Sequence, residues 1–227
     1  MDDVRVIEIK RSVFESNEKD ADRLREELSA RNVFLLNLMS SPGSGKTTLL
    51  SIIAGLDRPE SGKVYFQGED IEKIGLTEYR RNKIGIVFQQ YNLINYLTAY
   101  ENIELAMTET DNKIPQNHKE VAYALLERFG IVRSKADRRI SNLSGGEQQR
   151  VAIARAIASN VDLIFADEPT GNLDTATERE IIRIFKDLTE NYGKTIIVVT
   201  HSNLVSELSD HRTYLHDGIL TDTPVEE

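Results

Sequence analysis

Two segments near the middle of the chain carry residue types suited to phosphate chemistry. Residues 143–150 read Leu-Ser-Gly-Gly-Glu-Gln-Gln-Arg. A glycine pair that opens a helix offers free backbone N–H groups and the positive end of the helix dipole. Residues 161–168 read Val-Asp-Leu-Ile-Phe-Ala-Asp-Glu, an apolar run that ends in two carboxylates. The sequence therefore predicts a phosphate-binding helix start and an acidic pair at the mouth of a buried strand.

A third segment, residues 40–48, reads Ser-Ser-Pro-Gly-Ser-Gly-Lys-Thr-Thr. A phosphate-binding loop needs glycines so that backbone amides can surround phosphate oxygens, a lysine for the β/γ charge and a hydroxyl for Mg²⁺. The segment departs from the pattern G-x-x-x-x-G-K-[ST] at the first position, where Ser40 stands. The alternative is a chance glycine turn. The residues predicted to bind nucleotide here are Ser41, Pro42, Gly43, Ser44, Gly45, Lys46, Thr47 and Thr48.

The two adjacent acids have separate predicted roles. Asp167 is expected to hold Mg²⁺, directly or through water, together with Thr47. Glu168 is expected to polarise the attacking water as the general base. The alternative is an acidic pair that caps the next helix or is simply solvated.

Two further polar residues follow predicted strands. His201 comes after the run Ile-Ile-Val-Val-Thr, where ligands gather at the carboxyl ends of strands in open α/β sheets, and it is expected to hydrogen-bond the γ-phosphate. Gln89 follows a strand predicted at 84–88 and can touch both Mg²⁺ and water. The alternatives are a helix cap or surface residue for His201 and a surface glutamine for Gln89.

A second copy of the chain is expected at the site, because Ser144, Gly145 and Gly146 are separate in sequence from the loop at 40–48. One molecule then carries two phosphate-binding surfaces. The economical explanation is a head-to-tail dimer in which each surface completes the site of the other subunit.

Composition excludes several other kinds of site. The 227 residues include 28 basic and 37 acidic side chains, and the net charge of −9 argues against broad nucleic-acid binding. The chain has no cysteine, which rules out disulfides, thiolate metal sites and cysteine nucleophiles. The longest apolar runs are strand-sized and no signal-peptide core follows the first residues. A soluble, cytoplasmic chain is expected, with any membrane link made through a partner.

Strands alternate with helices along the chain, which favours an α/β fold with a largely parallel sheet. Strands are predicted at 4–10, 33–39, 63–67, 84–88, 161–166, 194–200 and 212–216. Helices are predicted at about 17–30, 46–54, 97–107, 121–129, 147–159, 175–191 and 203–208, with a further helical piece between 67 and 84. Residues 108–117 are predicted to form a loop, and the tail at 221–227 is predicted to fray.

This set of motifs resembles the nucleotide-binding domain of ABC transporters. The resemblance spans residues 40–222, with motifs at 43–48 (Walker A), 89 (Q-loop), 143–148 (signature), 164–168 (Walker B), 171–174 (D-loop) and 201 (H-switch). The sequence is similar to the lipoprotein-releasing and macrolide-exporter branch of this family in three segments, residues 55–59, 87–93 and 167–174. The resemblance implies ATP sandwiched between two such domains, with Ser144 and Gly146 acting across the interface and Asp174 among the nucleotide-binding residues. It also implies an integral-membrane permease that grips the helical region near 89–102.

The first fifty residues do not fit that family, in which the domain usually starts with an antiparallel hairpin carrying an aromatic residue that stacks on adenine. Segments 6–10, 17–25 and 34–47 instead resemble the hydrogenase nickel-incorporation GTPase. Beyond about residue 50 nothing of that GTPase remains, since the chain lacks the Asn-Lys-x-Asp motif and has no cysteine for nickel. The sequence therefore predicts a mosaic: residues 1–50 as an atypical, GTPase-like segment with the P-loop strand, and residues 51–227 as an ABC-type ATPase domain with a helical subdomain at about 90–160.

Two consequences of a mosaic start are open to test. Phe14 is the candidate for the adenine-stacking aromatic residue. With a helix at 17–30 in place of a strand, the small antiparallel sheet around 63–67 is expected to lose a neighbour and expose an edge.

The leading prediction is a P-loop NTPase with a mostly parallel central sheet, a helical signature subdomain and an atypical N-terminal segment. It acts as the motor subunit of an ABC transporter, in which Mg-ATP closes a dimer and hydrolysis reopens it. Two alternatives stay open. One is a module that binds nucleotide without productive dimerisation, and the other is a GTPase-type metallochaperone.

Overall fold

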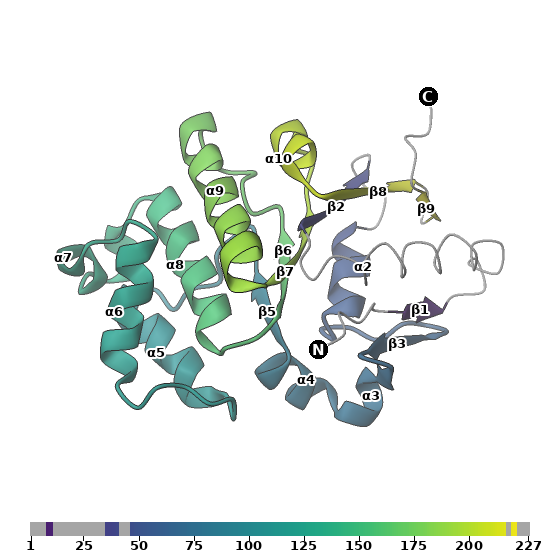
Figure 1. The fold of residues 1–227 in the computed structure, drawn as a ribbon, viewed down its shortest axis with the longest axis horizontal. Coiled ribbons are helices and arrows are strands. Elements are labelled where there is room, and N and C mark those ends of the chain that lie inside the picture. The colour runs from purple at the N-terminus through teal and green to yellow at the C-terminus, as the bar shows by residue number, and fades with distance from the viewer. Residues whose placement is uncertain (1–7, 11–34, 41–45, 217–218, 222–227) are drawn as a thin grey trace.

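The computed structural model describes residues 8–10, 35–40, 46–216 and 219–221 (Figure 1). Within these residues a sheet of six strands has the order β5-β6-β7-β2-β8-β9. The first five strands in that order are parallel, and β9 pairs antiparallel with β8. The strand bounds are β5 Ile84–Val87, β6 Leu163–Asp167, β7 Thr195–Val199, β2 Leu35–Ser40, β8 His211–His216 and β9 Ile219–Thr221. The predicted α/β fold with a mostly parallel sheet is confirmed.

Helices cover both faces of this sheet (Figure 1). One side carries α5 Ala99–Glu109, α6 His118–Arg128, α7 Arg133–Ala136, α8 Gly145–Ala158 and α9 Thr175–Tyr192. The other side carries α2 Lys46–Ile53, α3 Ile71–Ile74 and α4 Leu76–Asn82. The remaining helices are the short 3₁₀ turn Ile140–Asn142 and α10 Asn203–Leu208.

The apolar run in β6 is continuous because successive side chains pack alternately into the hydrophobic cores on the two faces of the sheet. Ile164 and Ala166 belong to the core shared with α5, α6, α8 and α9. Leu163 and Phe165 belong to the core shared with α2. Side chains alternate between the two faces of a strand, so a strand buried on both sides has no polar position until it ends. In β6 that end is Asp167.

Helix α9 shows how local sequence sets an element next to the site. Its buried residues Ile181, Ile182, Phe185 and Leu188 recur at helical spacing, which packs one face of the helix on the sheet. The helix ends at Gly193, whose φ of 62° is the left-handed conformation that favours glycine.

A second, smaller sheet corrects one prediction. Strand β3 Lys63–Phe66 lies between β1 Glu8–Lys10 and β4 Glu69–Asp70, and both pairings are antiparallel. Strand β3 is therefore paired on both sides, and the exposed edge expected around 63–67 does not lie on this strand. The alternating residues before position 11 supply the neighbour directly, so the pairing does not depend on the segment at 17–30.

Several other boundaries differ from those predicted. The helical piece between 67 and 84 is two helices, α3 and α4, separated by Gly75 with φ 93°. The two-residue strand β4 was missed because it is too short to show alternation. Residues 221–227 were predicted to form a frayed tail, but Thr221 belongs to β9, where it pairs with Tyr214. The helix predicted at 17–30 and Phe14 lie outside the described residues.

Candidate functional site

The carboxyl ends of four neighbouring parallel strands bring the predicted catalytic residues to one edge of the sheet. Gln89 follows β5, Asp167 ends β6 with Glu168 directly after it, and His201 lies two residues beyond β7. Strand β2, next to β7, ends at Ser40 and leads into the predicted phosphate-binding loop. Open α/β sheets bind ligands outside the carboxyl ends of their strands. The strand order thus gathers into one place residues that lie far apart in sequence.

Glu168 is held by the end of the neighbouring strand. Its backbone N–H donates to the carbonyl oxygen of Val199 at 2.7 Å. The hydroxyl of Thr200 donates to its Oε2 at 3.1 Å, and Nε2 of His201 lies 3.5 Å from its Oε1. Glu168 has a φ of 44°, in the left-handed region that non-glycine residues rarely adopt. Such backbone strain clusters at functional sites, and here it accompanies a carboxylate fixed by its neighbours and only 19% exposed.

Asp167 lies on the side of the sheet that carries α2. Its position continues the alternation of Leu163 and Phe165, which pack with α2. Thr47 and Thr48 are exposed in the first turn of α2, the helix that follows the predicted phosphate-binding loop. Of that loop, Ser41, Pro42, Gly43, Ser44, Gly45 and the side chain of Lys46 lie outside the described residues.

Gln89 lies against the loop that follows Glu168. A Cβ placed on Gly171 would lie 3.4 Å from Nε2 of Gln89 and 3.7 Å from Cβ of Glu168. Asn172 donates from Nδ2 to the carbonyl oxygen of Gln89 at 3.5 Å. The exposed Gln89 and the predicted base Glu168 therefore both lie close to Gly171.

The signature segment forms a capped helix start. Oγ of Ser144 accepts from the N–H of Glu147 at 3.3 Å, and Oε2 of Glu147 accepts from the N–H of Ser144 at 2.8 Å. This reciprocal capping box fixes the first turn of α8. Gly145 and Gly146 precede the first residues whose N–H groups bond within the helix, so their amides belong to the positive end of α8.

Glu147 also pairs with Nζ of Lys135. Burial acts to raise the pKa of Glu147, but the bonds from Lys135 and from Ser144 together outweigh it and leave that pKa below its ordinary value. The carboxylate that completes the capping box is therefore kept ionised.

Asp174 in the D-loop acts as the N-cap of α9. Its Oδ1 accepts from the N–H groups of Ala176 and Thr177 at 3.0 Å each, and its Oδ2 accepts from the hydroxyl of Thr177 at 2.8 Å. The bond from the Thr177 N–H, followed by the hydroxyl bond, lowers the pKa of Asp174. The side chain stays exposed beside these bonds.

The signature helix α8 and helix α2, which follows the predicted phosphate-binding loop, lie on opposite faces of the sheet. Helix α8 packs on β5 and α9 on β7 and β2, whereas α2 packs on β6 and β7 from the opposite face. Figure 1 shows α8 and α2 on opposite sides of the sheet. The start of α8 and the described residues of α2 are thus held by different faces of the sheet within one chain.

Sequence reasoning missed a residue that ties two of the site loops together. Oε1 of Glu178 accepts from the hydroxyl of Thr170 at 3.2 Å and from the hydroxyl of Ser202 at 2.5 Å. Thr170 follows Glu168 by two positions and Ser202 follows His201. The positions of Thr170 and Ser202, just after the predicted catalytic residues, can be read from the sequence. That both donate to Glu178 on α9 cannot.

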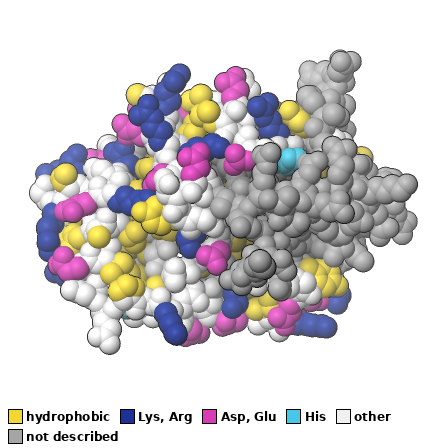
Figure 2. Space-filling view, in the orientation of Figure 1, with side chains coloured by type: hydrophobic (Ala, Val, Ile, Leu, Met, Phe, Trp, Pro, Cys, Tyr) yellow, Lys and Arg dark blue, Asp and Glu magenta, His cyan; other side chains and the backbone are white. Residues whose placement is uncertain are grey.

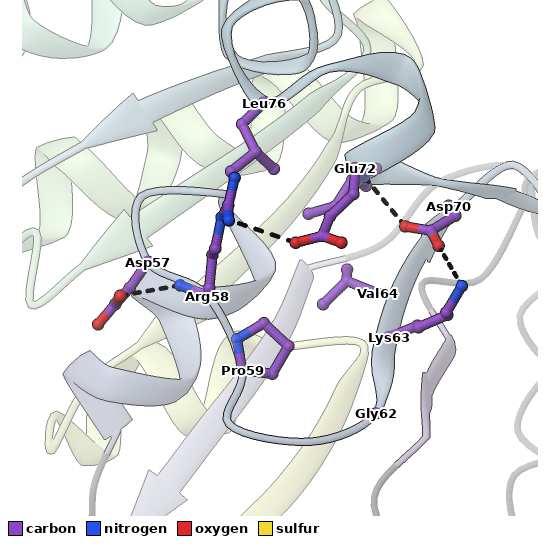
Figure 3. Close-up of a pocket in the computed structure, with 10 residues that line it drawn as sticks. Asp57, Arg58, Pro59, Gly62, Lys63, Val64, Asp70, Glu72 and Leu76 are labelled. Atoms are coloured by element: carbon purple, nitrogen blue, oxygen red, sulfur yellow. Dashed lines mark hydrogen bonds and ion pairs between the residues drawn. The ribbon is translucent and has the colours of Figure 1, made fainter.

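The small pocket in Figure 3 contains none of the predicted site residues. Its charged groups are paired with one another. Arg58 lies 3.7 Å from Glu72, and Lys63 lies 2.9 Å from Asp70. We interpret it as a packing gap between the α2–β3 loop and α3, because its charges are already neutralised.

The described surface carries charges of both signs (Figure 2). On the face shown in Figure 2, the described Lys and Arg side chains are interspersed with Asp and Glu instead of forming the basic stripe typical of nucleic-acid binding. In the part of the chain that the structure covers, no group of three or more His, Cys, Asp or Glu could hold a metal ion. No described helix is long and apolar enough to cross a bilayer.

The chain is similar in sequence and in fold to known proteins. The chain is 44% identical over 184 residues to the uncharacterised ABC transporter ATP-binding protein YclH of Bacillus subtilis, covering 81% of each. It is 39% identical over 195 residues to the lipoprotein-releasing system ATP-binding protein LolD 1 of Rhodopseudomonas palustris, covering 85% of this chain and 86% of the relative. It also resembles the dimeric, post-hydrolysis structure of the cassette MJ0796, from Methanocaldococcus jannaschii, bound to ADP and Pi.

The similarity to MJ0796 has a TM-score of 0.75 at 40% identity and covers 85% of this chain and 86% of that one. A model of the ABC transporter family matches residues 27–171, which include both the phosphate-binding loop and the signature segment. With its strand order, acidic strand end and capped signature helix, the chain belongs to the ABC transporter family as an ATP-binding cassette that hydrolyses ATP.

Proposed function

We propose that this ATPase works as a head-to-tail homodimer, in which the phosphate-binding loop of one subunit and the signature helix of its partner hold the same ATP. The observation that carries the proposal is the placement of α8 and α2 on opposite faces of the sheet. A single chain cannot direct both segments at one nucleotide, whereas a twofold partner can. The relative MJ0796 is dimeric with ADP and Pi bound.

Within one subunit, the phosphates lie on the loop at 41–48, with Lys46 against the β/γ charge. Glu168 takes a proton from the attacking water as that water bonds to the γ-phosphorus. The bond from the γ-phosphorus to the bridging oxygen breaks, which gives ADP and inorganic phosphate. His201 contacts the γ-phosphate. Support for this assignment is that Glu168 and His201 adjoin one another and that Thr200 orients the carboxylate.

Mg²⁺ fits the donor set at this edge of the sheet. Thr47, Gln89 and Asp167 each offer an oxygen atom, the donor that a hard cation prefers. Asp167 lies on the α2 side, where Thr47 is exposed. The bound ion would supply neutralisation of charge on the β- and γ-phosphates. A single carboxylate is typical, since Mg²⁺ keeps water and phosphate oxygens as its other ligands.

An integral-membrane permease is the proposed partner, with contact near residues 89–102 and the cassette on the cytoplasmic face of the membrane. Tyr96 in this segment is 74% exposed, and exposed aromatic residues are enriched at protein interfaces. The relative LolD 1 is named for a lipoprotein-releasing system, and a MacB relative from Syntrophobacter fumaroxidans is named as a combined ATP-binding and permease protein. Nucleic acid is not a proposed partner.

The test is sedimentation of Glu168→Gln with and without Mg-ATP, alongside phosphate release by the unmodified chain. We expect dimers that form only with ATP, and turnover abolished by the substitution with ATP binding retained. Glu190→Gln, on an exposed position of α9, is the matched control and is expected to turn over normally. A variant that binds ATP but stays monomeric would favour the alternative of a binding module without productive dimerisation.

The mosaic origin of residues 1–50, and the division into 1–50, 51–227 and a helical subdomain at about 90–160, also remain proposals. The ABC transporter family model matches from residue 27, inside the proposed 1–50 segment, so that match leaves only residues 1–26 for an unrelated start. ATP affinity of Phe14→Ala tests the adenine-stacking role. Competition between ATP and GTP tests the GTPase-like kinship, because a GTPase-type chain would prefer GTP.

A further inference from the structure

Thr177, in the first turn of α9, contacts two segments that the proposed dimer directs at the partner's nucleotide. One is the D-loop. The hydroxyl of Thr177 donates to Oδ2 of Asp174 at 2.8 Å, and its N–H donates to Oδ1 at 3.0 Å. The carboxylate of Asp174 is thereby held against the start of α9, and its orientation depends on Thr177.

The other segment is the signature helix. A Cβ placed on Gly146 would lie 2.5 Å from Cγ2 of Thr177 and 3.6 Å from its Cβ and Oγ1. Real Cβ atoms do not approach other atoms so closely, so only glycine lets α8 come this near to α9. The methyl group of Thr177 therefore lies against the backbone of Gly146, beside the N–H groups at the start of α8.

The two contacts are not independent, because both groups are attached to one Cβ. A β-branched side chain has few χ1 rotamers, and the hydroxyl bond to Asp174 selects one of them. In that rotamer the methyl group faces Gly146. A shift of the D-loop therefore rotates or moves the group that supports the signature helix.

We infer that Thr177 is a positioning residue, which fixes the spacing between Asp174 of the D-loop and Gly146 of the signature helix. The inference rests on the proposed dimer, in which both segments must meet the partner subunit at the same time. Because one rigid side chain links the D-loop and the signature helix, the two segments keep a fixed relative position when they meet the partner subunit. Neither contact involves the subunit's own phosphate-binding loop, so loading of ATP on the monomer does not depend on it.

Two substitutions separate the contacts. Thr177→Ser keeps the hydroxyl and removes the methyl group, and Thr177→Val keeps the shape and removes the hydroxyl. Both are made in the Glu168→Gln background. Sedimentation gives the ATP concentration at half-maximal dimerisation. Fluorescence of N-methylanthraniloyl-ATP, at a protein concentration below that of dimerisation, gives the affinity of the monomer.

We expect each substitution to raise the ATP concentration for dimerisation about fivefold, as loss of one methyl contact or one hydrogen bond implies, with monomer affinity unchanged. The matched controls are Thr108→Ser and Thr108→Val. Thr108 is a helical, exposed threonine whose hydroxyl donates to Glu104. It lies near the far end of α8, where Ser159 donates to Ala106, about 20 Å from Gly146 along the helix axis.

The outcomes are distinguishable. If Glu168→Gln itself fails to dimerise with ATP, the proposed function fails and the inference falls with it. If Glu168→Gln dimerises and neither Thr177 variant shifts the ATP dependence, only the inference is overturned. A shift with one variant alone refutes the linkage of the two contacts. If the affinity of the monomer for the fluorescent nucleotide falls as much as dimerisation does, Thr177 has a general structural role, and the inference is also overturned.

Discussion

The hydroxyl of Thr200 donates a hydrogen bond of 3.1 Å to Oε2 of Glu168. Thr200 follows β7 and is 1% exposed, whereas Glu168 follows β6. The carboxylate proposed as general base is therefore oriented by a buried residue directly after the neighbouring strand, and this geometry exists only because the two strands pair.

Replacing Thr200 by valine removes this donor and keeps the shape of the side chain. We expect kcat for ATP hydrolysis to fall about tenfold, because a hydrogen bond to a charged group contributes about 1.5–3 kcal/mol, while the KM for ATP stays unchanged. Steady-state kinetics measures both. Thr189→Val is the control, since Thr189 is also 1% exposed and its hydroxyl donates to Lys186. Equal losses of kcat in both variants would contradict a role for Thr200 in orienting Glu168.

Asp167→Asn tests the proposed Mg²⁺ ligand. The amide keeps an oxygen donor but removes the negative charge that attracts the cation. We expect the Mg²⁺ concentration at half-maximal hydrolysis to rise about tenfold or more, with the fold unchanged by circular dichroism. Removal of Mg²⁺ by a chelator is expected to stop hydrolysis in the unmodified chain. An unaltered Mg²⁺ dependence in the variant would exclude Asp167 as a ligand.

The effect of Gly146→Ala on the free energy of unfolding is predicted to depend on the residue at position 177. In the unmodified chain the new Cβ meets Cγ2 of Thr177, and overpacking of this kind costs about 1–3 kcal/mol. This exceeds the gain of about 1 kcal/mol from replacing a helical glycine by alanine. In the Thr177→Ser background the obstacle is gone, so the same change is expected to be neutral or stabilising. Urea unfolding of the four proteins decides, and destabilisation of equal size in both backgrounds would refute the contact.

The ion pair and capping bonds of Glu147 predict a dependence of stability on pH. The folded-state pKa of Glu147 lies below the ordinary 4.5, so its contribution is fully present above pH 4.5 and is lost as the pH falls through the folded-state pKa. We expect Glu147→Gln to lower the free energy of unfolding by about 1 kcal/mol at pH 7, with the difference from the unmodified chain shrinking below pH 4.5. Glu190→Gln, at an exposed position, is expected to show no such convergence. A difference that stays constant down to pH 3 would contradict this account.

Some features could be predicted from the sequence because they depend on neighbours within a few positions. The two residues of the capping box, Ser144 and Glu147, are three positions apart, and the apolar run of β6 ends at its acidic pair. Gly193 is the C-cap of α9, so the helix ends within two residues of the predicted end. Helix caps, side-chain alternation and backbone conformation are local properties, so motif spacing was enough to predict the elements and the chemistry of their ends.

Other features were decided only by tertiary structure. The strand order β5-β6-β7-β2 places Gln89, Glu168 and His201 together, and β1 pairs with β3 where an exposed edge was expected. The contact between Thr177 and Gly146 joins residues 31 positions apart. Such relationships depend on which strands pair and how closely helices pack. These are properties of the whole folded chain, and no short stretch of sequence specifies them.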